Sequence, residues 1–291
     1  MKESRAEKVF SYFNIGFLSI LAIVTVYPLI YVLFASLSDP TQLMSHTGAL
    51  IKPLGFSIKA YEMVFSFPNI TRGYINTIII VVGGVAVNIL MTSFGAYFLS
   101  RKNIFIKKYI MLGIVFTMFF SGGLIPLYLV VNGIGLRDNL LALILPVSIN
   151  TTNLIILRTA FMAVPESLVE SAEMDGAGHF TLLFKVMIPL AKPTVATLVL
   201  FYAVYHWNSW FNASIFLQNE DLYPLQLILR EILILGNTTS ISGGVNDANV
   251  LGVADAVKYS VIVFATLPIL CLYPFLQKYF VKGVMIGAVK G

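Results

Sequence analysis

One segment of the sequence, residues 158–192, combines residue types and spacings that suit a specific contact with another protein. Pro165 suits the first turn of a helix, and the carboxylates of Glu166 and Glu170 favour the positive end of the helix dipole. Gly176, with a second glycine two residues later, would end this helix after about three turns. A second helix would then run toward Pro189. The segment is therefore predicted to form a helix, a glycine turn and a helix.

The first of these helices is expected to leave one face without a partner inside the chain. Its residues are Leu168, Ala172, Met174 and Ala177. Small side chains there would let the surface of another protein come close. The alternative is a plain connector between two helices, but a connector needs neither this length nor this spacing of glycine and proline. The pattern favours a docking segment.

The sequence contains no motif typical of catalysis. There is no Gly-rich loop ending in Lys-Ser or Lys-Thr, no dinucleotide-binding fingerprint, no His-Glu-x-x-His and no cysteine pair. The chain is therefore not expected to be an enzyme, to hydrolyse ATP, or to bind a cofactor or a metal itself. Its one cysteine, Cys271, is expected to be a buried and inert thiol.

Long blocks without charged residues surround the docking segment. The chain is 58% hydrophobic and 11% charged, whereas about a quarter of an average soluble domain is charged. About 20 helical residues cross the hydrocarbon core of a bilayer, and six charge-free blocks of at least 19 residues reach that length. Core helices of a large soluble protein would need polar outer faces, which these blocks lack. The sequence predicts an all-α polytopic membrane protein with six transmembrane helices, at about 13–36, 75–99, 109–131, 139–158, 193–216 and 259–279.

The distribution of Lys and Arg predicts the orientation. If both termini lie in the cytoplasm, 13 of the 19 Lys and Arg residues are on the inner side, and the outer six are accompanied by eight carboxylates. This bias has the sign that the positive-inside rule requires. The net charge of +5 is therefore a signal of topology and gives no reason to expect nucleic-acid binding.

The two long outer segments are expected to differ in structure. Residues 39–72 contain several prolines and are expected to form an irregular cap with one short helix near 60–65. Residues 220–258 are expected to begin with a short interfacial helix at 224–233 and to continue as an exposed polar loop. The short turn at 132–138 is expected to make the third and fourth spans a tight antiparallel pair.

The docking segment resembles the signature loop of binding-protein-dependent importer permeases, the membrane subunits of ABC importers. That signature reads Glu-Ala-Ala, three residues, Gly, nine residues, Ile-x-Leu-Pro. Glu170, Ala172, Gly176 and Pro189 stand at the required spacing, while Ser171, Val186 and Ile188 replace an alanine, the isoleucine and the leucine.

This resemblance implies that the whole chain, 1–291, is one transmembrane domain with the type I importer permease fold. Residues 161–192 would be its cytoplasmic coupling loop, which docks on an ATPase subunit. Glu170 would contact basic or polar groups of the ATPase, Ala172 would pack at the contact, and Gly176 would supply the bend. The expected contact residues are Glu170, Ser171, Ala172, Asp175, Gly176, Ala177, Val186, Ile188 and Pro189.

The resemblance also implies a set of partners. These are a homologous second permease, two cytoplasmic ATPase subunits that bind ATP and Mg²⁺, and an extracytoplasmic solute-binding protein that docks on 39–72 and 220–258. The chain would lie in the bilayer of a bacterial plasma membrane.

Two further stretches resemble the carbohydrate branch of this family, in particular the second permease of maltose-type importers. They are 206–210, which reads His-Trp-Asn-Ser-Trp, and the carboxyl end from Gln277 to Gly291. The stretch 124–146 further resembles importers of oligosaccharides, including oligomers of uronic acids. The expected cargo is a sugar or an oligosaccharide.

Sugars are recognised by aromatic faces and by side-chain hydrogen bonds, so polar and aromatic side chains within the spans are candidates for the pathway. The predicted pathway residues are Asn76, Asn150, Asn153, Tyr202, Tyr205, His206 and Asn208, with Asn88 and Thr92 as further candidates. The same side chains could instead hold helices together or anchor the chain at the interface. For His206, a hydrogen bond to a neighbour is expected rather than a metal.

Two other classes of protein remain open at this point. The first is a six-span secondary transporter or channel, although proton- and ion-coupled carriers usually need a charged residue in mid-span and none is present here. The second is a membrane scaffold without a pathway. ATP hydrolysis by a partner that co-purifies with the chain would separate the importer from both.

Overall fold

The computed structural model describes residues 5–66, 68–102, 104–234 and 256–271, and within these ranges the regular secondary structure is helical. The chain divides into two compact units. One comprises Met1–Pro68 with Glu231–Leu267, and the other comprises Asn69–Arg230 with Pro268–Gly291.

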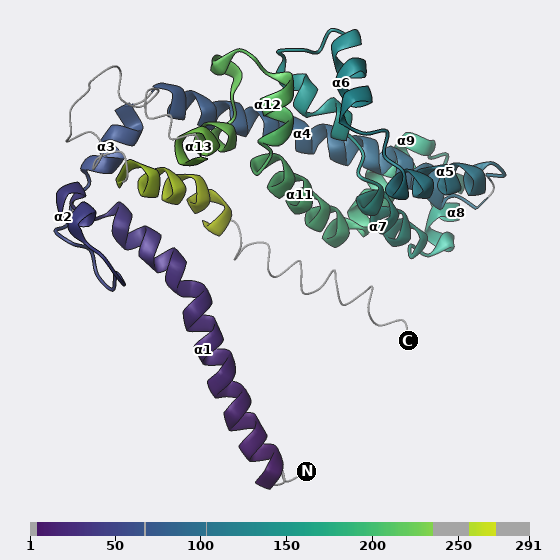
Figure 1. Cartoon of the computed structure of the whole chain (residues 1–291). Helices are drawn as coiled ribbons and strands as arrows, with labels where there is room; N and C mark the ends of the chain where they lie inside the picture. Colours follow the sequence, from purple (N-terminus) through teal and green to yellow (C-terminus); the bar gives the residue numbers. More distant parts are fainter. Residues whose placement is uncertain (1–4, 67, 103, 235–255, 272–291) are drawn as a thin grey trace. The chain divides into compact units, whose positions relative to one another are not determined.

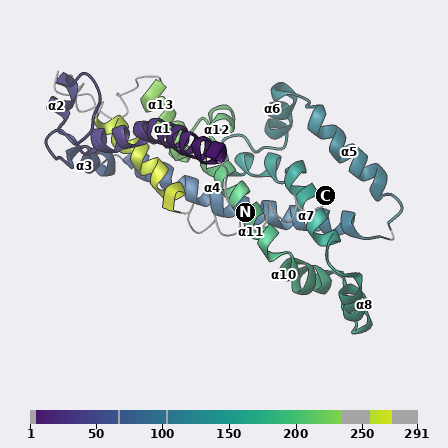
Figure 2. The same cartoon turned by 90° about the horizontal axis from the view of Figure 1, so that it is seen from below.

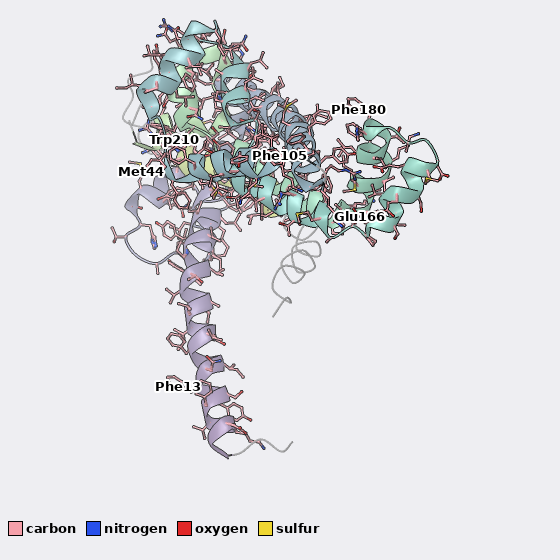
Figure 3. All side chains as sticks on the ribbon, turned by 90° about the vertical axis from the view of Figure 1, so that its right-hand side faces the viewer. Phe13, Met44, Phe105, Glu166, Phe180 and Trp210 are labelled. Carbon is pink, nitrogen blue, oxygen red and sulfur yellow. The ribbon has the colours of Figure 1, made fainter. Side chains whose placement is uncertain are left out.

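The first unit is dominated by α1 (Arg5–Ser36), a helix that is apolar on every face. None of the residues in the most apolar stretch of this helix is buried. Figure 3 shows its side chains, Phe13 among them, projecting outward along its length. A helix that is hydrophobic all round and has no protein around it suits a lipid environment. This helix contains the first predicted span.

The outer segment of this unit contains two short helices, α2 (Pro40–Ser45) and α3 (Lys59–Ser66). The second matches the expected helix near 60–65, whereas α2 was not expected. The residue that starts α2 is nevertheless next to it in the sequence. Asp39 caps α2 by accepting hydrogen bonds from the backbone N–H groups of Thr41 and Gln42. The hydrogen bond from the Thr41 hydroxyl, together with these backbone bonds, holds the pKa of Asp39 below its ordinary value.

A small apolar core holds this outer segment against the end of α1. It comprises Ala35, Leu43, Leu50, Ala60 and Ala256. The last of these begins the helix Ala256–Cys271, within which Cys271 is exposed, so the expectation of a buried thiol is wrong. A thiol on an apolar helix that crosses a bilayer can face lipid, which requires no burial by protein. The predicted sixth span, 259–279, lies partly outside the described residues.

The second unit is built around α4 (Pro68–Ser100), an unbroken helix of 33 residues (Figure 1). It is followed by α5 (Lys107–Phe119), α6 (Leu124–Gly133), two short 3₁₀ turns (Leu140–Leu143 and Leu145–Val147), α7 (Thr151–Met162) and α8 (Glu166–Met174). The remaining elements are α9 (His179–Thr181), a π-helical stretch (Leu182–Met187), α10 (Ile188–Leu190), α11 (Lys192–Trp207), α12 (Phe211–Phe216), a 3₁₀ turn (Glu220–Leu222) and α13 (Leu225–Ile234). The last of these matches the short helix expected at 224–233.

Two apolar cores lie along α4. The first joins α4 to α7, α8 and α11, for example through Leu99, Leu157 and Leu198. The second joins α4 to the 3₁₀ turns, α12 and α13, for example through Ile80 and Phe216. Because both cores include α4 residues, this helix is the structural axis of the unit.

Several of the predicted spans are broken. Only α1 and α4 are individually long and apolar enough to cross a membrane, and counting each bent pair of helices as one span gives up to five among the described residues. The bends are 116° between α5 and α6, 53° before α7, and 88° between α10 and α11. Figure 2 shows α5 and α6 meeting at an angle, so the range 109–131 consists of two helices and is not one straight helix.

The breaks have local causes. Between α5 and α6, Gly123 has φ +86°, a left-handed conformation that glycine adopts without strain. Before α7, Pro146 lies within the second 3₁₀ turn, and Asn150 has extended backbone and caps the new helix. The range 193–216 likewise contains two helices, because α11 ends at Trp207 and α12 begins at Phe211.

Candidate functional sites

The predicted helix, glycine turn and helix are confirmed in the docking segment. Pro165 precedes the first residue of α8, and α8 ends at Met174. Gly176 has φ +80°, which a side chain would strain, so this position requires glycine for its backbone conformation. Helical structure resumes at His179 and continues through α10.

The two faces of α8 have different environments. Val169 is buried in the core shared by α4 and α7, and Ala172 and Ala177 are half-buried against the same core. The expectation that these two alanines have no partner inside the chain is therefore wrong, because they follow Val169 on the inward face. Leu168 and Met174 are 46% and 89% exposed, as expected for a free face.

The other predicted contact residues divide in the same way. Val186 and Ile188 are half-buried and pack against the core. The exposed ones are Glu170, Ser171, Asp175, Gly176 and Pro189. The segment therefore presents an acidic and polar surface next to two exposed apolar side chains.

The inward face of α8 also makes ion pairs that were not predicted from the sequence. Arg101 pairs with Glu173, and Lys102 pairs with Glu166. Both cations directly follow α4 in the sequence, and Figure 3 labels Glu166 at the start of α8. A separation of 72 residues along the chain between Arg101 and Glu173 leaves no pattern from which this pairing could be predicted.

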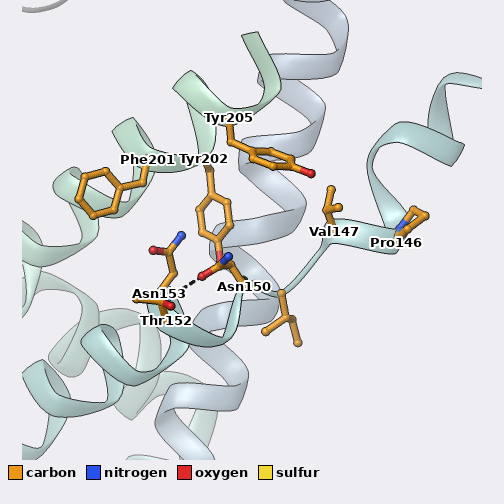
Figure 4. A pocket seen from close by; sticks show the side chains of 9 residues that line it. Pro146, Val147, Asn150, Thr152, Asn153, Phe201, Tyr202 and Tyr205 are labelled. Carbon is orange, nitrogen blue, oxygen red and sulfur yellow. Dashed lines mark hydrogen bonds between the residues drawn. The ribbon is translucent and has the colours of Figure 1, made fainter. Parts of the chain in front are cut away.

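A cavity of about 480 Å³ lies where the chain breaks before α7, facing α11 (Figure 4). Four of the seven predicted pathway residues, Asn150, Asn153, Tyr202 and Tyr205, line it together. Its other lining residues are Pro146, Val147, Ile149, Thr152 and Phe201. The lining contains aromatic rings, amides and hydroxyls but no charged side chain.

The pocket is held together around Tyr202. Its hydroxyl lies 2.8 Å from the hydroxyl of Thr92 on α4 and accepts a hydrogen bond of 3.2 Å from the backbone N–H of Asn150. The side chain of Asn150 in turn accepts a hydrogen bond of 3.1 Å from the backbone N–H of Asn153. Tyr202 is therefore a structural member of the pocket wall.

Asn153 and Tyr205 are more available to a ligand. Asn153 is 7% exposed, and its side-chain amide makes no hydrogen bond to the part of the chain that the structure describes. Figure 4 shows this amide beside Tyr202 and Phe201, while the ring of Tyr205 lies near Val147. Tyr205 is 47% exposed.

The other three predicted pathway residues lie outside this pocket. Asn76 donates hydrogen bonds of 2.8 and 3.2 Å to the backbone carbonyls of Asp221 and Tyr223, which ties α4 to the outer segment. Asn208 donates to the carbonyl of Val204 within its own helix end. These two amides satisfy backbone groups.

His206 bonds a neighbour, as expected. It is 1% exposed, and its Nε2 lies 2.6 Å from Oδ1 of Asn88, whose Nδ2 donates to the carbonyl of Val147. Gly84 on α4 lies so close to the imidazole ring that an added Cβ would overlap it. In the described part of the chain no three His, Cys, Asp or Glu residues are grouped so that they could hold a metal ion.

Comparisons with known proteins show the family to which the chain belongs. The family model described as "Binding-protein-dependent transport system inner membrane component" matches residues 109–286, more than half of the chain. The chain is 40% identical over 291 residues to Protein LplC of Bacillus subtilis, covering 100% of this chain and 98% of that one. It is also 40% identical over 289 residues to the polygalacturonan/rhamnogalacturonan transport system permease protein YtcP of the same organism, covering 98% of this chain and 99% of the relative.

A solved structure shares the fold. It is the crystal structure of a bacterial ABC transporter involved in the import of the acidic polysaccharide alginate, one chain of which matches with a TM-score of 0.88 and 31% identity. The match covers 96% of this chain and 99% of that one. The chain therefore belongs to the binding-protein-dependent ABC transporter permeases of the carbohydrate uptake family, as the non-catalytic, multi-pass membrane subunit of a sugar or oligosaccharide importer.

Proposed function

We propose that this permease forms, with a homologous second permease, the passage for an oligosaccharide derived from an acidic polysaccharide. Two ATPase subunits would drive the passage between inward-open and outward-open states through the coupling loop, residues 161–192. The observation that carries the proposal is that four predicted pathway side chains from two separate helices meet around one cavity. A membrane scaffold without a pathway has no need of such a pocket.

The pocket has the chemistry that sugar recognition needs. Tyr205 offers an aromatic face, and Asn153 offers both an amide donor and a carbonyl acceptor. A uronate carboxylate here would also be close to the positive end of α7, which begins at Thr151. The printed functions of YtcP and of the alginate importer, both of which concern acidic polysaccharides, support this class of cargo.

The coupling loop suits contact with an ATPase on its exposed side. Leu168 and Met174 provide apolar contact area, and Glu170, Ser171 and Asp175 surround it with polar groups. The inward face, with Val169 and Ala172, is already occupied by the permease itself. We therefore place the ATPase contact on the outward face of α8, with Gly176 supplying the bend to the next helix.

The orientation follows from the charges. The coupling loop and both termini would lie in the cytoplasm, where the ATPases bind. The extracytoplasmic binding protein would dock on the outer segments 39–72 and 220–258, of which 235–255 lies outside the described residues.

The coupling loop is tested by purification of the permease from its own membranes in mild detergent, followed by identification of partners and an ATPase assay. Glu170→Arg is expected to release the ATPase subunits while the chain still inserts. Lys52→Glu, an equally drastic charge change at an exposed position of the outer segment, is the control and should retain them. If the wild type purifies alone and no ATP hydrolysis accompanies it, the importer mechanism is refuted and a secondary carrier becomes the working hypothesis.

The cargo is tested by uptake into proteoliposomes that contain the complete transporter and its binding protein. We expect oligogalacturonate to be taken up and a neutral malto-oligosaccharide of equal length to be excluded. Asn153→Leu should reduce uptake of oligogalacturonate, whereas Asn208→Leu, outside the pocket, should not. Equal uptake of the neutral oligomer would contradict the acidic class of substrate.

A further inference from the structure

We propose that Arg101 and Lys102 are positioning residues that clamp the coupling helix α8 to the end of α4, so that a displacement of α8 is passed to α4. This inference rests on the proposed role of the coupling loop. It assigns a function to two cations that lie outside the signature of the loop. It also gives a physical connection between the loop and the pocket.

The clamp, which we define as Arg101 and Lys102, contacts α8 at two points on one face. Glu166 and Glu173 are seven residues apart, which is about two helical turns, so their side chains project in similar directions. Lys102 pairs with Glu166 and Arg101 pairs with Glu173. Val169 lies between the two carboxylates and is 6% exposed. Two ion pairs on either side of a buried apolar contact fix both the position and the rotation of α8.

The backbone that carries these cations is itself fixed. The guanidinium of Arg158 on α7 donates a hydrogen bond of 3.1 Å to the carbonyl of Leu99. The ammonium of Lys107 on α5 donates to the carbonyls of Arg101 and Lys102, at 2.5 and 3.2 Å. Cations suit this place because the last carbonyls of a helix have no partner within the helix and carry its negative dipole end. The backbone that carries the two cations is therefore held by two neighbouring elements, α7 and α5.

A third contact joins the same end of α4 to the helix that follows α8. The hydroxyl of Tyr97 lies 3.0 Å from Nδ1 of His179, the first residue of α9. The guanidinium of Arg101 lies over the ring of Tyr97, at 5.5 Å from its centroid. A single exposed ion pair contributes little free energy. Here the Arg101–Glu173 pair is linked to the ring of Tyr97, and we assign both pairs the function of setting geometry.

The other part of α4 contacts the pocket. Thr92 bonds Tyr202 in the pocket wall and Asn88 bonds His206, and both Thr92 and Asn88 lie on α4, the unbroken helix that ends directly before the two cations. The eight residue steps from Thr92 to Ser100, the last residue of α4, span about 12 Å of helix at 1.5 Å per residue. An unbroken helix transmits a push at one end to the other, which makes α4 the element through which loop and pocket are coupled.

Charge reversal and its rescue test the clamp in the assembled transporter in proteoliposomes. Arg101→Glu and Glu173→Arg should each leave the ATPase subunits bound and hydrolysing ATP, but should lower sugar uptake per ATP hydrolysed by about tenfold, within the usual range of coupling between sites. The combined variant, in which both charges are exchanged, should recover most of that ratio. Lys108→Glu, the reversal of an exposed cation close to the clamp, should leave the ratio unchanged.

The outcomes separate this inference from the function on which it rests. If the wild type shows no uptake stimulated by the binding protein, both are overturned. If the wild type is coupled and Glu170→Arg releases the ATPase, but both single reversals keep the wild-type ratio, the clamp alone is overturned. A combined variant that folds, judged by yield and thermal unfolding, and still fails to recover would also overturn it, because simple loss of structure rather than the ion pair would explain the single variants.

Discussion

The hydroxyl of Tyr202 allows a quantitative test of how the pocket is held together. This one oxygen joins α11 to α4 through Thr92, and to the start of α7 through the backbone N–H of Asn150. Tyr202 is 3% exposed and Thr92 is 0% exposed, so water cannot readily replace the lost partner of Thr92. Tyr202→Phe removes the oxygen and keeps the ring.

The expected loss can be estimated from these contacts. Two hydrogen bonds contribute about 1 kcal/mol each, and a buried polar group left without a partner adds about 1 kcal/mol or more. Thr92 can recover part of this by donating to the carbonyl one helical turn earlier. The variant is therefore expected to lose about 2 kcal/mol of stability, which corresponds to a lowering of the unfolding midpoint by about 5 °C.

A matched control lies one helical turn away on the same helix. Tyr205→Phe removes a hydroxyl from the same pocket, and in the described part of the chain that hydroxyl has no hydrogen-bond partner. Its effect is expected to be below about 0.5 kcal/mol.

The assay is thermal unfolding of the purified permease in detergent, followed by intrinsic fluorescence. In a double-mutant cycle with Thr92→Val, Tyr202→Phe should show a coupling energy of about 1 kcal/mol. The reasoning is refuted if the two tyrosine variants unfold at the same temperature, or if the effects of Tyr202→Phe and Thr92→Val are additive.

Two further predictions concern close packing and pH. Gly84→Ala should destabilise the permease by about 1–3 kcal/mol in the same unfolding assay, because the Cβ of the new alanine would lie 2.7 Å from ring carbons of His206. Gly113→Ala is the control and should be neutral or slightly stabilising, because nothing lies within 4 Å of a Cβ at that position. The Asp138 carboxylate accepts backbone hydrogen bonds from Asn219, at 2.8 Å, and from the preceding residue, and these hold its pKa below the ordinary value of 3.8. Its contribution to stability is therefore fully present above pH 3.8 and is lost as the pH falls through the lower, folded-state value. Unfolding midpoints measured against pH should show this loss in the wild type and not in Asp138→Asn, and a loss near neutral pH would contradict the assignment.

The sequence by itself determined the environment of the chain and its local helical segments. Membrane spans can be predicted from charge-free blocks of this length because crossing a bilayer depends on length and composition, which are local properties. The helix that begins after Pro165 and the turn at Gly176 can be predicted for the same reason. Proline restricts its own backbone, and glycine adopts the left-handed conformation of this turn without strain. The break at Gly123 and the cap at Asp39 carried local signals too, although neither element was predicted.

Only the tertiary structure decided which polar side chains meet. Thr92 and Tyr202 are 110 residues apart, and Asn88 and His206 are 118 apart, yet both pairs are hydrogen-bonded. It also separated Asn153, which lines the pocket, from Asn76, which ties two segments together, although both are asparagines within apolar blocks. A side chain in an apolar helix can be satisfied by backbone, by another helix or by a ligand, and the choice depends on how the helices are rotated and packed. That rotation is set by the apolar cores along α4, whose members come from distant parts of the chain and leave no spacing that a single sequence reveals.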